Sequence, residues 1–282
     1  MRQLGLLVNS IARATTSGER LFAVLDQEPD IKDKPDAKDL EVTEGSLTLD
    51  NVSFAYTLGE DTVPVLSNVN LQVGRGQTVG IVGPPGAGKS TIAHLVPRFY
   101  DVTEGSIRID GQDVRDVTLK SLRSVVSVIQ QDIFLFTAGI EHNIAYGNPW
   151  AERDRIISAA DAAQLHTYID ALPEGYGTLV GERGVSLSGG QRQRLVIART
   201  LLMKPAIMIF DDSTAAIDAV TEQRILERLR EQSRDAALII ISHRLSSLMH
   251  ADEILFIDEG RVMERGTHAE LLAHGGRYAA LY

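Results

Sequence analysis

The stretch from Thr78 to Thr91 reads Thr-Val-Gly-Ile-Val-Gly-Pro-Pro-Gly-Ala-Gly-Lys-Ser-Thr. Its first five residues form a short apolar run, which predicts a buried strand over Thr78–Val82. A glycine-rich turn follows, and a helix is expected to begin near Lys89. Glycines let backbone N–H groups approach an anion closely, and a helix N-terminus favours negative charge. The order of strand, turn and helix therefore predicts a phosphate-binding loop in an α/β fold.

The residues within this loop have the spacing of the P-loop motif of nucleotide-binding proteins. Lys89 supplies a point charge for the β- and γ-phosphates, and the Ser90 hydroxyl suits Mg²⁺. Pro85 has no N–H and cannot donate to phosphate, so the expected donors begin at Gly86. The expected ATP-binding residues of the loop are Gly83, Gly86, Gly88, Lys89, Ser90 and Thr91.

A second apolar run, Ile207–Phe210, ends in two acids, Asp211 and Asp212. Ligands of parallel α/β sheets bind at the carboxyl ends of the strands. With a P-loop in the same chain, Asp211 is expected on the Mg²⁺ side of the nucleotide. Asp212 is then expected to face the water that attacks the γ-phosphate.

A third motif narrows the class of nucleotide-binding protein. Leu187-Ser188-Gly189-Gly190-Gln191, followed by Arg192-Gln193-Arg194, resembles the signature sequence of the ATP-binding cassette (ABC) family. A chance match to such a pentapeptide is rarer than about one in a thousand chains at average residue usage. Ser188 and the glycine N–H groups form a predicted anion site at the start of a helix that runs to about Met203. The resemblance implies that the signature contacts ATP through Ser188, Gly189, Gly190 and Gln191.

Other positions follow the order of the ABC family. Tyr56 matches the aromatic residue that stacks on adenine, and Asp218 matches the D-loop aspartate at the nucleotide. Gln131, next to Gln130, resembles the Q-loop glutamine that reaches Mg²⁺ and the attacking water. His243 matches the switch histidine that contacts the γ-phosphate. The resemblance therefore implies ATP and Mg²⁺ as cofactors.

One position departs from the family pattern, since glutamate usually stands where this chain has Asp212. The carboxylate is shorter by one methylene, and a displacement of about 1 Å can cost on the order of a hundredfold in rate. The resemblance then implies a slow, degenerate site of a heterodimeric exporter. A homodimeric cassette with Asp212 as the catalytic acid stays open. The implied catalytic residues are Asp212, His243 and Gln131, and the implied metal ligands are Ser90, Gln131 and Asp211.

The sequence around the motifs predicts an α/β fold. Three parts are expected. They are a P-loop NTPase core (a mostly parallel sheet flanked by helices), an antiparallel β subdomain and an inserted α-helical subdomain. The ABC nucleotide-binding domain is expected over 45–282, with the helical subdomain at about 133–203. The expected strands are Ser46–Tyr56 and Val65–Val73 in the antiparallel region, and Thr78–Val82, Ser124–Ile129, Ala206–Phe210, Ala237–Ile241 and Glu253–Ile257 in the main sheet.

Residues 1–44 differ from the rest of the chain in their pattern of apolar and charged residues. Apolar residues recur at helical spacing from Leu4 to Ile11, and Thr16 with Glu19 has the spacing that caps a second helix start. A charged, proline-containing linker follows over Asp26–Gly45. The segment resembles the cytoplasmic extension of the last membrane helix of an exporter. Membrane helices are therefore expected to precede Met1.

Composition bounds the partners and the compartment. The chain has 28 Lys and Arg, 38 Asp and Glu, a net charge of −10 and no cysteine. The acidic balance argues against a nucleic-acid partner, which needs a basic surface, and the lack of cysteine excludes disulfides. No apolar stretch reaches the about 20 residues of a membrane helix. The chain is expected at the cytoplasmic face of the plasma (inner) membrane, attached through membrane helices outside it.

The family resemblance implies two partners. One is a second ABC nucleotide-binding domain, packed head to tail around two ATP, and the other is the transmembrane domain of the transporter. Gly181-Glu182-Arg183-Gly184 resembles the exporter X-loop, although Leu179 stands where exporters usually have glutamate. Four alternatives stay open: an ABC ATPase of DNA repair or chromosome organisation, a ribosome-binding ABC factor, an importer subunit, and a non-catalytic nucleotide-binding domain.

Overall fold

The computed structural model describes residues 2–59, 61–181, 187–214, 216–232 and 236–281. The chain divides into two compact units, 1–32 and 33–282. The smaller unit contains one helix, α1 (Arg2–Leu25). The predicted second helix start at Thr16 is wrong, because α1 runs through this residue and its Oγ1 donates to the Ala12 carbonyl at 3.0 Å instead of capping a new helix. Among the described residues, no helix is both long and apolar enough to span a bilayer.

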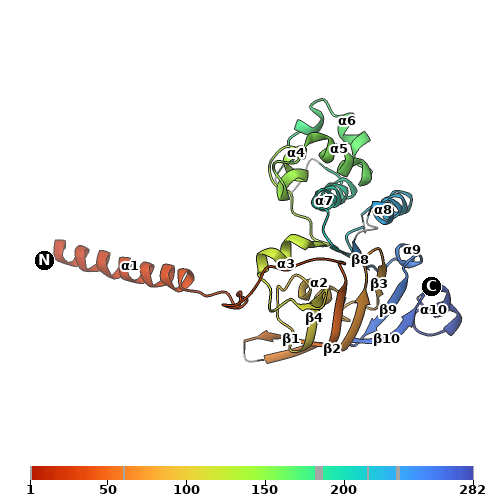
Figure 1. Cartoon of the computed structure of the whole chain (residues 1–282). Coiled ribbons are helices and arrows are strands. Elements are labelled where there is room, and N and C mark those ends of the chain that lie inside the picture. Colours follow the sequence, from red (N-terminus) through yellow and green to blue (C-terminus); the bar gives the residue numbers. More distant parts are fainter. Residues whose placement is uncertain (1, 60, 182–186, 215, 233–235, 282) are drawn as a thin grey trace. The chain divides into compact units, whose positions relative to one another are not determined.

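The larger unit contains a four-stranded antiparallel sheet with the order β2-β1-β4-β5 (Figure 1). Its strands are β1 (Leu47–Leu58), β2 (Asp61–Val73), β4 (Glu104–Ile109) and β5 (Gln112–Asp113). Leu47 and Leu49 of β1 are buried, as are Val69 and Leu71 of β2, so apolar residues alternate toward one face. The predicted antiparallel β subdomain is confirmed.

A six-stranded sheet with the order β10-β9-β3-β8-β7-β6 carries the predicted motifs. Its strands are β3 (Thr78–Val82), β6 (Val126–Ile129), β7 (Ile207–Asp211), β8 (Ala237–Ile241), β9 (Glu253–Asp258) and β10 (Arg261–Gly266). All pairs are parallel except β9 with β10. Every residue of β3, β7 and β8 is buried, which explains their continuous apolar runs.

Helices pack around this sheet, and α4 to α7 gather in one lobe (Figure 1). The helices of the larger unit are α2 (Lys89–Leu95), α3 (Leu119–Val125), α4 (Ile140–Ile144), α5 (Arg153–Ala162), α6 (His166–Asp170), α7 (Gly189–Met203), α8 (Ala219–Gln232), α9 (Leu245–Leu248) and α10 (His268–His274). The predicted strand start at Ser124 is wrong. That residue belongs to α3, which Thr118 begins by accepting a hydrogen bond from the Ser121 N–H at 3.3 Å.

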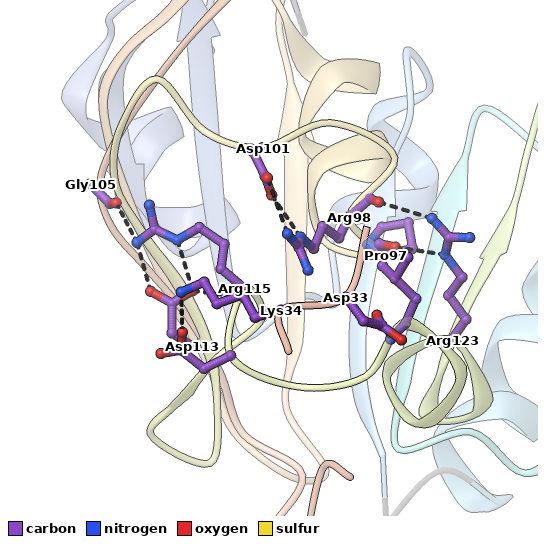
Figure 2. Close-up of polar contacts among 11 residues, drawn as sticks. Asp33, Lys34, Pro97, Arg98, Asp101, Gly105, Asp113, Arg115 and Arg123 are labelled. Carbon is purple, nitrogen blue, oxygen red and sulfur yellow. Dashed lines mark hydrogen bonds and ion pairs between the residues drawn. The ribbon is translucent and has the colours of Figure 1, made fainter. Parts of the chain in front are cut away.

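The loop that follows α2 is held by two arginines, and one of them, Arg123, joins it to α3 (Figure 2). Arg98, which is only 4% exposed, donates from Nε to Asp101 Oδ1 at 2.7 Å. Arg123 of α3 donates to the carbonyls of Pro97 at 3.1 Å and Arg98 at 3.0 Å. The Arg123 guanidinium also lies 5.2 Å from the centre of the Phe99 ring. These contacts fix the helix that begins at the P-loop lysine.

The last residues of the predicted linker are part of the larger unit. The Asp110 carboxylate, just after β4, accepts hydrogen bonds from the four consecutive backbone N–H groups of 43–46, at 2.7 to 3.0 Å. Burial on its own would raise the pKa of Asp110, but these bonds hold it well below the usual range. Segment 43–46 is therefore tied to β4.

Candidate functional site

The predicted P-loop lies between β3 and α2. The Lys89 Nζ donates to the carbonyls of Gly83 at 2.9 Å and Pro84 at 2.8 Å, so the lysine folds back over its own loop. A Cβ added at Gly83 would lie 1.9 Å from the Ile257 carbonyl oxygen. Gly88 has φ +95° and begins α2, where an added Cβ would lie 2.6 Å from Leu66. At these two positions only glycine fits.

Two of the predicted metal ligands, Ser90 and Asp211, meet at the end of β7. The Ser90 Oγ donates to Asp211 Oδ1 at 3.0 Å, and Asp211 is 6% exposed. Burial raises the pKa of Asp211, against the hydrogen bond from Ser90. Burial lowers the pKa of Lys89, while the charges of Asp212 and Asp211 oppose that change. The carboxylates of Asp211 and Asp212 thus favour the charged form of Lys89.

These donors fit Mg²⁺ held partly by nucleotide. The ion prefers hard oxygen ligands and is often bound by one or two carboxylates together with substrate phosphates. The described residues contain no group of three or more His, Cys, Asp or Glu that would hold a metal on their own. The hydroxyl of Ser90 and the carboxylate of Asp211 therefore suit an ion that completes its shell with phosphate and water.

The two predicted catalytic residues after β7 and β8 contact each other. The Asp212 carboxylate accepts a hydrogen bond from the His243 backbone N–H at 3.0 Å, and its second oxygen lies 3.2 Å from His243 Nε2. Asp212 has φ +44°, and its own N–H donates to the Ile241 carbonyl at 2.9 Å. With this left-handed backbone, the carboxylate lies against the segment that follows β8 and carries the histidine.

Tyr56 lies beside the P-loop helix. Its hydroxyl is 3.4 Å from Thr91 Oγ1, and its ring makes edge-on contacts with Phe54 and Tyr100, with centroids 4.7 and 5.2 Å away. The ring is thereby held from two sides.

Gln131 is exposed in the loop that follows β6. Because Ile129 pairs with Phe210, this loop leaves the sheet next to Asp211 and Asp212. The register of the two strands thus brings the predicted Q-loop to the same edge of the sheet as the acids.

The signature residues start α7 as predicted. Ser188 Oγ accepts from the Gln191 N–H at 3.2 Å, and Gln191 Oε1 accepts from the Ser188 N–H at 2.8 Å, which forms a capping box. A Cβ added at Gly190 would lie 2.9 Å from the Ala216 carbonyl, and one at Gly189 would lie 3.2 Å from the Ala216 Cβ. The signature turn therefore packs against the segment that leads to α8.

Asp218 caps α8 and is exposed. Its Oδ1 accepts from the Thr221 N–H at 3.0 Å, and hydrogen bonds with Thr221 hold its pKa below the usual value. The predicted site residues thus fall into two groups. The first lies at the P-loop and the ends of β7 and β8, and the second lies at the start of α7 and Asp218. Of the X-loop residues, Glu182, Arg183 and Gly184 lie outside the described part of the chain, and Leu179 is 69% exposed.

Sequence reasoning missed a buried carboxylate near both groups. Glu222 of α8 is 3% exposed and binds Thr214, Arg244 and Ser247. A signal was present, because Glu222 precedes the buried Ile225 and Leu226 at helical spacing and so falls on the inner face of α8.

Comparisons with known proteins agree with this geometry. The family model of ABC transporters matches residues 66–215, more than half of the chain. An uncharacterized ABC transporter ATP-binding protein of Bacillus subtilis, YknU, is 45% identical over 279 residues, which cover 99% of this chain and 47% of that protein. A Staphylococcus aureus protein named for multidrug export, an ATP-binding/permease protein, is 45% identical over 93% of this chain and 45% of its own length.

Among solved structures, a bacterial Atm1-family ABC exporter with ATP bound matches with a TM-score of 0.92 and 43% identity, over 99% of this chain and 49% of that one. The chain thus spans about half the length of the relatives that it matches. The P-loop, the signature helix and these similarities together show that the chain belongs to the ABC transporter family, as a nucleotide-binding domain homologous to exporter ATP-binding/permease proteins.

Proposed function

We propose that this domain binds ATP with Mg²⁺ and hydrolyses it to drive an exporter at the cytoplasmic face of the membrane. The observation that carries the proposal is the P-loop, in which Lys89 rests on its own loop carbonyls beside Asp211 and Asp212. On binding, the Lys89 Nζ would exchange these carbonyls for β- and γ-phosphate oxygens. Mg²⁺ held by Ser90, Asp211 and Gln131 would neutralise the charge that develops on the phosphates.

The second group of site residues supports pairing with another cassette. Ser188 and the N–H groups of Gly189 and Gly190 would form an anion site at the start of α7. The two glycines lie against Ala216, and we infer that this site contacts the ATP of a partner. The exposed Asp218 lies just after this packing segment. The partner is a second nucleotide-binding domain, in a homodimer or a heterodimer.

An aromatic patch supports contact with the transmembrane domain. Phe134 and Tyr146 are 60% and 58% exposed, and Phe136 lies between them, stacked on Tyr146 at 4.1 Å and edge-on to Phe134 at 5.0 Å. The Arg199 guanidinium lies 5.7 and 5.8 Å from the Phe136 and Tyr146 ring centres. Exposed aromatic clusters mark interaction surfaces, and this one begins three residues after Gln131 in the sequence.

The test of ATP binding is Lys89→Ala in the full chain. Loss of a charged hydrogen-bond donor worth about 1.5–3 kcal/mol should weaken ATP binding on the order of 10- to 100-fold, measured by calorimetry with Mg-ATP. Lys120→Ala, on the exposed face of α3, is the matched control and should leave affinity unchanged. Unchanged affinity in Lys89→Ala would contradict the proposal.

We further propose that Asp212 makes this the slow site of a heterodimeric exporter. The Asp212 side chain is one methylene shorter than the glutamate usual at this position. Its carboxylate contacts both the backbone N–H and the Nε2 of His243. Asp212→Glu should raise phosphate release at saturating ATP by about tenfold or more, because the longer side chain reaches further toward the attacking water. Asp212→Asn is the control. If Asp212→Glu gives no increase while Asp212→Asn abolishes release, Asp212 is instead the acid of a homodimeric cassette.

A further inference from the structure

A buried carboxylate that the proposed reaction does not use ties three segments together. Glu222 lies on the first turn of α8, and its Oε1 accepts hydrogen bonds from Thr214 Oγ1 and Ser247 Oγ, both at 2.6 Å. Its Oε2 accepts from an Arg244 guanidinium N–H at 3.1 Å. A carboxylate that is 3% exposed is retained in a fold only when such donors satisfy it.

The partners of Glu222 sit next to the two groups of site residues. Thr214 follows Asp212 by two positions, and Arg244 directly follows His243. The Arg244 Nη1 that binds Glu222 also donates to the Ile217 carbonyl at 2.9 Å, one residue before Asp218. One guanidinium thus links the segment beside the switch histidine to the segment that carries Asp218.

The inner face of α8 packs into the core next to Glu222. Ile225, Leu226 and Leu229 are buried in the same hydrophobic cluster as Leu248 of α9. A pocket of about 170 Å³ lies beside this contact, and Glu222, Ser247 and Met249 are among the residues that line it. The hydrogen bonds of Glu222 add polar links between α8 and the segment that follows His243.

We propose that Glu222 is a positioning residue that couples the segment of Asp218, which meets the partner cassette, to the switch residue His243. The inference rests on the proposed function, because it assigns this route to the closing of two cassettes on ATP. Displacement of Ile217 by the partner is passed through the Arg244 guanidinium, which Glu222 holds in place, to the adjacent His243. Glu222 itself does not touch nucleotide.

The test compares Glu222→Gln with Glu227→Gln in the full chain. Glutamine keeps the volume and an acceptor for Thr214 and Ser247, but loses the charge that holds Arg244. Glu227 lies on the same helix, exposed, where Oε1 accepts from Gln223 at 2.9 Å, and it serves as the matched control. Thermal unfolding, ATP affinity, and the kcat, KM and Hill coefficient of phosphate release are measured for both.

We expect Glu222→Gln to lower kcat on the order of tenfold or more, because His243 is no longer held in position relative to the segment of Ile217 and Asp218. ATP affinity should stay within about twofold, since the P-loop is untouched, and the Hill coefficient should fall. Glu227→Gln should match the wild type. Full kcat in a folded Glu222→Gln variant would overturn the proposal.

Two milder variants keep the question open to test if Glu222→Gln unfolds. Ser247→Ala and Thr214→Val each remove one hydroxyl from the same carboxylate. Each should lower kcat while leaving ATP affinity in place, and their effects should be non-additive because they share one acceptor. Strictly additive effects, or none, would contradict the coupling. The Lys89→Ala variant tests only the proposed function, through its loss of ATP binding. A failure of the coupling through Glu222 can therefore be distinguished from a failure of the proposed function.

Discussion

The P-loop and the signature turn are both predicted phosphate sites at the start of a helix, yet they are built differently. At the P-loop, Gly83 packs against Ile257 and Gly88 against Leu66, and Lys89 and Asp211 are buried. At the signature, Ser188 is exposed and its hydroxyl is bound to the helix that it caps. The P-loop site is built at the end of a buried strand, whereas the signature site is an exposed helix end.

The difference shows what each half contributes. A buried site holds its donors in place before ligand arrives, at a cost in desolvation of charged groups. An exposed helix end carries no such cost and adapts to whatever docks on it. Under the proposed function, the first would determine affinity for nucleotide, and the second would determine whether nucleotide joins two cassettes.

The largest expected effect comes from adding one methyl group to the buried site. Gly83→Ala would place a Cβ 1.9 Å from the Ile257 carbonyl, which should cost about 3 kcal/mol or more in unfolding free energy. Gly86→Ala is the control, because no atom lies within 4 Å of its added Cβ. Its φ of +78° should cost only about 1 kcal/mol. Urea unfolding of both variants measures the contrast, and equal losses would show that the loop is not packed as described.

An intermediate effect is expected at the exposed helix end. Ser188→Ala removes the cap of α7 and should destabilise the chain by about 1 kcal/mol. Nucleotide affinity of the single chain should not change, whereas ATP-dependent pairing, followed by size-exclusion chromatography with light scattering, should weaken. Weaker ATP binding to the monomer would break the division between the two sites.

The smallest expected effect is a gain in stability. Burial raises the pKa of Asp211, so its charged form costs stability above that pKa, and the cost fades as pH falls through it. Asp211→Asn should therefore raise the melting temperature of the nucleotide-free chain at pH 7 by about 2 °C, with no gain below about pH 4.

Asp113→Asn gives the matched control for Asp211→Asn, with the opposite sign. Burial opposes ionisation of Asp113, but hydrogen bonds from Arg115 hold its pKa below the usual value. Its charged form therefore stabilises the fold above the unfolded pKa, and replacement should lower the melting temperature at pH 7. A lower melting temperature in both variants would show that Asp211 is not under strain from burial.

Much of the fold could be predicted because the core strands are local patterns. Thr78–Val82 and Ala237–Ile241 were predicted with the observed bounds, since fully buried strands leave continuous apolar runs. The errors at Ser124 and Thr16 lie at residues that belong to a helix, where each hydroxyl donates to a carbonyl of the preceding turn, that of Ser121 or Ala12.

The contacts within the site were beyond reach of the sequence. Asp212 and His243 are 31 positions apart, and their pairing depends on two strands lying side by side. Glu222 was overlooked because a glutamate on a helix is usually solvated, and only the tertiary fold brings Thr214 and Ser247 to it. Chemistry-bearing residue types were therefore predictable, but the bonds that orient them were not.

The grip of Asp110 on the amides of 43–46 has a mechanical consequence. A flexible linker would extend under a pulling force and would not pass the force on to the sheet. Here a force on the chain before Thr43 acts on four backbone amides that are hydrogen-bonded to one carboxylate, and it is passed directly to β4. A force on this segment is thus passed to the antiparallel sheet at β4 through the Asp110 carboxylate.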